Sequence, residues 1–181
     1  MSNDINISGG RALDDLLKTL APKLQKNIMR SALSAGARVI VKEARQRASV
    51  GPTSSTNEAI YGGYPGALKD SVRLSSGINK KGEPFASAKA GGLNKKGADV
   101  YYTGFVEYGT RAHVIRPRGR GRLQLAGHFV AGTVMHPGTT AKPFMRPAFD
   151  AAHAAAVAAV AAKIRERLTK QGLDVPAPVD V

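Results

Sequence analysis

Four histidines and one isolated glutamate are the residues whose chemistry must be explained first. The histidines could bind a metal ion or transfer protons, but no two lie one helical turn apart and few carboxylates are near them. They are His113, His128, His136 and His153. The chain has no cysteine, which excludes disulfides, thiolate catalysis and thiolate-bound zinc. No Gly-x-Ser-x-Gly motif is present, and no aspartate is placed to orient a histidine. We therefore expect no metal, no cofactor and no enzymatic activity.

Glu107 stands in a part of the chain that is short of acidic residues, directly before Tyr108, Gly109 and Thr110. General acid-base catalysis normally needs a second positioned group, and none is evident beside it. We therefore interpret Glu107 as structural. It could pair with an arginine or cap a neighbouring turn, and we favour a structural ion pair over a catalytic acid.

A cluster of arginines follows this glutamate. Its members are Arg111, Arg116, Arg118, Arg120 and Arg122, spaced by glycine and proline. Such spacing predicts a mobile loop, over residues 111–122, that cannot pack in a core. Guanidinium groups bind phosphate and carboxylate alike, so three interpretations stay open. The loop docks on an acidic partner protein, which we favour, contacts the phosphates of duplex DNA, or is merely solvated.

The overall composition agrees with a polyanionic or acidic partner. The 181 residues carry a formal net charge of +14 and a pI near 10.4. Aromatic residues are only 6% and tryptophan is absent, so stacking on single-stranded bases is less well supported than phosphate contact with a duplex. The first ten residues do not resemble a signal peptide, and the apolar tract 151–162 is too short to span a bilayer. We expect a protein made in the cytoplasm, with no membrane partner.

The hydrophobic pattern predicts helices at both ends and strands between them, within one domain of the α+β class. The expected helices cover residues 11–20, 22–48 and 148–171, the last one rich in alanine and closed by Gly172. The expected strands cover 71–78, 83–90 and 99–108 in an antiparallel meander, with a possible hairpin at 123–135. Both long helices should pack on this small sheet. Residues 50–66 form a loop or arm, and residues 172–181 an extended tail.

Three segments resemble a family of tailed-phage minor structural proteins, the tail components and neck proteins related to the tail-completion protein of lambda-type phages. In the first segment Gly66, Leu68 and Ser71 are similar to the family's Gly-x-Leu-x-x-Ser opening of the first strand. The second, most specific segment resembles the family's aromatic strand ending in Val-Glu-aromatic-Gly-Thr, at Phe105, Val106, Glu107, Tyr108, Gly109 and Thr110. The third resembles the Pro-Phe-hydrophobic-Arg-Pro-Ala entry to the last helix, at Pro143, Phe144, Arg146, Pro147 and Ala148.

This resemblance implies a non-enzymatic subunit of a ring, a hexamer by expectation, between the head-closure proteins and the tail tube. Its implied partners are copies of itself, the head-closure or stopper proteins, and the tail terminator or tail-tube proteins. Duplex DNA would pass through the lumen with non-specific contact. The implied location is the virion neck or upper tail, and the host cytoplasm during assembly. A tail terminator that caps the tube is the alternative, and a free duplex-DNA-binding protein is a more distant one.

Overall fold

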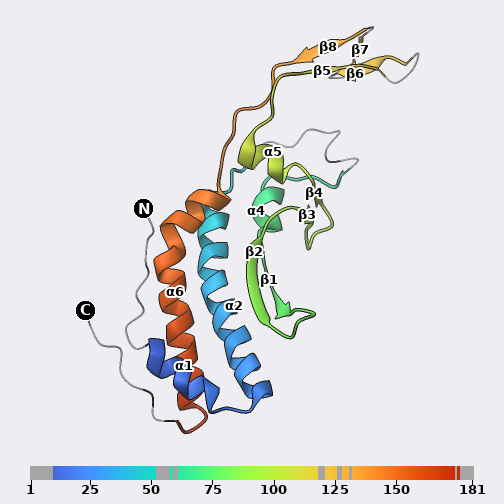
Figure 1. The fold of residues 1–181 in the computed structure, drawn as a ribbon. Coiled ribbons are helices and arrows are strands. Elements are labelled where there is room, and N and C mark those ends of the chain that lie inside the picture. Colours follow the sequence, from blue (N-terminus) through green and yellow to red (C-terminus); the bar gives the residue numbers. More distant parts are fainter. Residues whose placement is uncertain are drawn as a thin grey trace.

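The computed structural model describes residues 10–51, 58, 61–117, 121–125, 128–130, 132–173 and 175. Two long helices, α2 (Pro22–Arg47) and α6 (Met145–Thr169), lie side by side and antiparallel (Figure 1). The short helix α1 (Gly10–Lys18) crosses the end of this pair where α2 begins and α6 ends (Figure 1). The α+β class is therefore confirmed, and each of the three helices begins and ends within a few residues of the predicted bounds.

The strands form separate two-stranded antiparallel pairs rather than one meander. Strand β1 (Arg73–Ile78) pairs with β2 (Pro84–Lys89), and β3 (Gly92–Leu93) pairs with β4 (Asp99–Val100). The β1–β2 pair packs on one side of α2, while α6 packs on another side (Figure 1). The expectation that both helices cover the sheet is thus corrected. Helix α2 is the central layer, so it is buried on two sides, and its buried positions include Gly36, Ala37 and Val41.

Two groups of buried side chains hold the layers together. One lies where the C-terminal half of α2 meets the start of α6, and its centre is the fully buried Phe144. The other joins α1 to the opposite ends of α2 and α6, through Leu13, Ile28 and Leu168. Alanine at 32, 44, 148 and 152 lets the two long helices approach closely along their whole contact.

Gly36 lies where the two helices approach each other closely. A Cβ atom there would lie 2.6 Å from Val160 Cγ2 and 2.8 Å from the Ala156 carbonyl oxygen. Val160 can change rotamer, but the carbonyl oxygen belongs to the backbone of α6 and cannot move alone. The helices would have to separate.

We therefore expect Gly36→Ala to lower the free energy of unfolding by about 1–3 kcal/mol, the usual cost of overpacking. Better helix propensity offsets at most about 1 kcal/mol of this loss. Gly104→Ala is the matched control, because no atom lies within 4 Å of its built Cβ. Chemical denaturation of both variants measures the difference. Equal stability of the two would show that the helices pack more loosely than this distance requires.

The segment at residues 66–71 differs from its prediction. Residues Ala67–Ser71 form the short helix α4, and strand β1 begins only at Arg73. Gly66 precedes the helix with a φ of 88°, and Leu68 and Ser71 are buried. The Ser71 hydroxyl donates to the Leu68 carbonyl and accepts from the Gly91 N–H, so it fixes the turn from α4 into the sheet. Polar Ser71 is buried because both its hydrogen-bonding roles are satisfied.

Of the predicted loop or arm at 50–66, residues 50, 51, 58 and 61–66 are described, and residues 52–57, 59 and 60 lie outside the described residues. Of the predicted tail, residues 172, 173 and 175 are described. Gly172, with a φ of 75°, ends α6 through the bond from the Leu173 N–H to the Leu168 carbonyl.

Candidate assembly interface

Glu107 is the buried acid that joins the middle of the chain to helix α6. Its side chain is 8% exposed. Oxygen Oε2 accepts the backbone N–H groups of Phe144 and Met145 at 2.8 and 3.0 Å, and Oε1 accepts that of Arg146 at 3.0 Å. These are backbone N–H groups at the start of α6, which have no partner inside the helix. The next residue, Pro147, has no N–H to satisfy.

The hydrogen bonds of Glu107 connect the second and third segments of the family resemblance. One carboxylate satisfies three donors from a helix that begins 38 residues later, at Met145. Two structural roles were considered for Glu107, an ion pair with an arginine and a cap. These contacts are those of a cap, at the start of helix α6. The negative charge also lies at the positive end of the helix dipole, which favours it further.

Burial raises the pKa of Glu107, but the three backbone N–H donors and the charge of Arg146 outweigh it, so the net pKa lies below the ordinary value of 4.5. A lowered folded-state pKa means that the charged form stabilises the fold. This contribution is fully present above about pH 4.5 and is lost as the pH falls through the lower folded-state pKa.

We expect Glu107→Gln to lower the free energy of unfolding at pH 7 by about 1–3 kcal/mol, because its amide NH₂ group cannot accept a hydrogen bond and leaves a backbone N–H unsatisfied. The difference between wild type and variant should shrink as the pH is lowered below 4.5. Urea titrations at several pH values measure it. Glu58→Gln, at an exposed position, is the control. A pH-independent difference would rule out the charged cap.

The aromatic segment before Glu107 is a helix, and the predicted strand over residues 99–108 is wrong beyond Val100. Strand β4 has two residues, a turn follows at Tyr101 and Tyr102, and helix α5 covers Thr103–Tyr108. Strand propensity is weak and depends on context. Here the Lys142 N–H donates to the Val106 carbonyl, and the carboxylate of Glu107 has to reach the start of α6.

A helical period was already present in this segment. Tyr102 and Val106, four residues apart, lie half-buried against the core. Tyr101, Phe105 and Tyr108 lie on the outer side and are 52%, 51% and 75% exposed. A strand would instead have placed Phe105 and Glu107 on one face. The spacing of aromatic residues at i, i+4 and i+7 was the signal that could have indicated the helix.

These outward residues form an aromatic patch, which we define as Tyr101, Phe105 and Tyr108 together with the half-buried Tyr61. The Tyr101 ring lies 4.7 Å from that of Tyr61 and 6.4 Å from that of Phe105, between centroids. The chain has five phenylalanines and five tyrosines. A large share of its aromatic side chains therefore lies in one surface patch, and exposed aromatic clusters are typical of protein interfaces.

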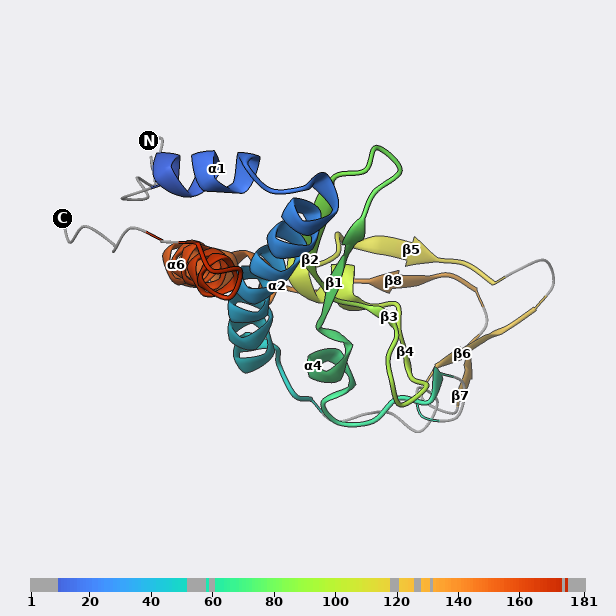
Figure 2. The same cartoon turned by 90° about the horizontal axis from the view of Figure 1, so that it is seen from below.

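A long β arm, residues 110–139, leaves the body directly after α5 and returns directly before α6 (Figures 1 and 2). Its base is closed by Thr110 and Thr139, whose backbones exchange two hydrogen bonds of 2.9 and 3.1 Å. Gly109, with a φ of 69°, allows the outgoing and returning segments of the arm to meet. A Cβ atom there would lie 2.5 Å from the Thr139 carbonyl oxygen. Gly109 and Thr110, the Gly-Thr pair of the sequence motif, therefore form the base of the arm.

The arm itself consists of two successive strand pairs. Strands β5 (His113–Ile115) and β8 (Val134–His136) pair near the body, and β6 (Leu123–Leu125) and β7 (His128–Val130) pair farther out (Figure 2). The predicted hairpin at 123–135 is confirmed only in part, since β6 and β7 pair within residues 123–130, whereas residues 134 and 135 belong to β8 and pair with β5. Residues 113–115 were predicted as part of a loop but form a strand, because their partner lies about 20 residues away along the chain.

The predicted arginine cluster belongs to this arm. Arg111, Arg116 and Arg122 are exposed, whereas Arg118 and Arg120 lie outside the described residues. Residues 108–149 contain no aspartate or glutamate. The sequence from 110 to 139 thus has five arginines and no acidic residue to neutralise them.

The histidines do not form a metal site among the described residues, where no group of three or more histidines, cysteines and acids is found. The fold does bring two of them together, which their spacing did not indicate. His113 and His136 face each other across β5 and β8 with ring centroids 5.0 Å apart. His136 Nδ1 accepts the Gly138 N–H, and His153 Nδ1 lies 2.8 Å from the Asp150 carbonyl oxygen.

The third predicted segment forms the start of α6. Phe144 and Ala148 are fully buried, and Arg146 is exposed. Pro147 occupies the first turn, where the missing N–H costs nothing. No helix in the described part of the chain is long and apolar enough to cross a membrane.

The described residues thus form a layered α+β body with an exposed aromatic patch and a basic arm. A family model described as "Bacteriophage HK97-gp10, putative tail-component" matches residues 11–109, more than half of the chain. The chain therefore belongs to this family of tailed-phage proteins and is a structural component of the tail region of the virion. Comparisons with curated proteins and with solved structures gave no match. The arm and α6 follow the matched range.

Proposed function

We propose that this protein is a subunit of a closed ring in the neck, which joins the head-closure complex to the tail and lets genomic DNA pass. The observation that carries the proposal is the acid-free basic arm beside the aromatic patch. A protein that works as a monomer gains nothing from either, since the arm repels itself and the patch exposes apolar surface to water.

The charge distribution supports a division of tasks between these surfaces. The aromatic patch lies on the body, where rigid apolar contacts can form the centre of an interface. The arginines lie on the arm, where exposed guanidinium groups can reach an acidic ring above or below. A net charge of +14 also suits a lumen through which duplex DNA moves.

Imaging of intact phage particles tests this proposal. We expect the chain as a ring of six subunits between the head-closure complex and the tail tube, with density for the arm against a neighbouring ring. The same ring at the end of tails that have not joined heads would instead identify a tail terminator. A monomer or a two-fold dimer in the particle contradicts the ring.

A further inference from the structure

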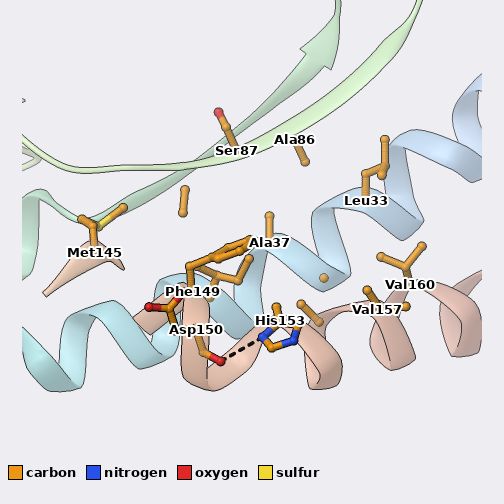
Figure 3. Close-up of a pocket in the computed structure, with 14 residues that line it drawn as sticks. Leu33, Ala37, Ala86, Ser87, Met145, Phe149, Asp150, His153, Val157 and Val160 are labelled. Atoms are coloured by element: carbon orange, nitrogen blue, oxygen red, sulfur yellow. Dashed lines mark hydrogen bonds between the residues drawn. The ribbon is translucent and has the colours of Figure 1, made fainter. Parts of the chain in front are cut away.

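An apolar groove of about 660 Å³ lies between α2, β2 and α6 (Figure 3). Its lining includes Leu33 and Ala37 from α2, Ala86 and Ser87 from β2, and Phe149 and Val157 from α6. Phe149 is 55% exposed although it belongs to an otherwise well packed helix. The groove therefore offers apolar surface that the described chain does not cover.

The wall formed by β2 is also an open sheet edge. Within the described residues β2 pairs only with β1, and β1 does not line the groove. In an antiparallel pair, alternate backbone N–H and C=O groups of each strand point away from its partner. Those of β2 that do not bond to β1 therefore point away from β1, and such an edge is a template for another strand.

The near part of the arm is an element of suitable shape and chemistry. Val114 and Met135 are directly paired across β5 and β8, so they share one face of the ribbon. They are 46% and 66% exposed. Each of the two strands has one edge without a partner among the described strands. The ribbon runs away from α2 and α6 in both views, so it does not lie in the groove of its own chain (Figures 1 and 2).

The charges of groove and ribbon are complementary. Asp150 is the acid among the groove-lining residues, it is exposed, and no lysine or arginine is among them. The exposed Arg111 and Arg116 flank strand β5 on either side. The ribbon brings no acid that would repel Asp150.

We propose that the ribbon β5–β8 of one copy lies in the groove of the next copy, adds a strand to the free edge of β2 and buries Val114 and Met135 against the groove. This inference rests on the proposed ring and specifies its subunit contact. Ribbon and groove are different surfaces of one chain, so the contact is head-to-tail. Repeated around an axis it closes a ring. Arg122, farther along the arm, stays free for a different ring.

Cross-linking in assembled particles tests the contact. Because the chain has no native cysteine, only the introduced cysteines of this chain can react. We would introduce Ser87→Cys in the groove with Val114→Cys on the ribbon, and treat particles with a short bismaleimide, whose reach covers more than one strand register. The control pairs Val114→Cys with Asp15→Cys, a residue with 79% side-chain exposure on α1. We expect a ladder of covalent oligomers of this chain up to the ring size for the first pair, and none for the control.

The other outcomes separate this inference from the proposed function. A visible ring in which the first pair cross-links no better than the control overturns the inference and leaves the ring standing. Cross-linking of Ser87→Cys to a different protein also overturns it, because the groove then has another occupant. Particles without any ring contradict the proposed function itself.

A charge on the ribbon face provides a second measurement. We expect Val114→Asp to leave the thermal midpoint of the purified chain unchanged, since this side chain is exposed, while the ring disappears from particles. A normal ring with the aspartate in place would overturn the inference.

Discussion

Replacing Phe144 by alanine should destabilise this protein strongly, because Phe144 is the largest of its fully buried side chains. It lies between two prolines at the point where the chain turns from the arm into α6. Its ring packs in the core with Val72, Val100 and Leu68. Truncation of a fully buried phenylalanine costs about 3–5 kcal/mol, which for a chain of this size lowers the thermal midpoint by about 6–20 °C.

Phe149→Ala is the matched control for this prediction, because it removes the same kind of side chain from the same part of the chain. Phe149 is 55% exposed, so its loss should change the midpoint of the purified chain far less. Differential scanning calorimetry of both variants gives the comparison. An equal effect of the two would mean that Phe144 is not the anchor of α6.

The second large effect is expected from the arm, in a variant with alanine at four of its arginines. These are Arg116, Arg118, Arg120 and Arg122. If the arm docks on an acidic neighbouring ring, the variant should keep its stability and its affinity for duplex DNA, yet yield filled heads without attached tails. We favour this outcome, because passing DNA is better served by weak lumen contacts than by a flexible arginine clamp.

Contact with DNA predicts a different result. The purified protein would then bind duplex non-specifically, and the slope of log affinity against log salt would fall by up to about 3.6 in the variant, about 0.9 for each phosphate that an arginine no longer neutralises. The control removes four exposed positive charges from α2 instead. Its members are Lys23, Arg30, Arg38 and Lys42. Normal tail attachment with unchanged DNA binding would leave the arginines merely solvated.

Sequence reasoning was strongest where one local interaction determines the structure. The bounds of α2 and α6 were indicated to within a few residues by the hydrophobic pattern, and the end of α6 by Gly172. The charge of the arm was also readable, because it depends only on composition. These features are set by neighbours a few residues apart, which a sequence displays directly.

The tertiary structure decided the features that depend on distant partners. The aromatic segment became α5 because Glu107 meets N–H groups almost 40 residues later along the chain. Residues 113–115 became a strand because residues 134–136 pair with them. The groove exists only where α2, β2 and α6 come together. The sequence by itself determined helices α1, α2 and α6, the charge and the family resemblance. Only the packing of remote segments determined the cap, the arm and the groove, since a carboxylate or a strand edge takes whichever partner the fold brings to it.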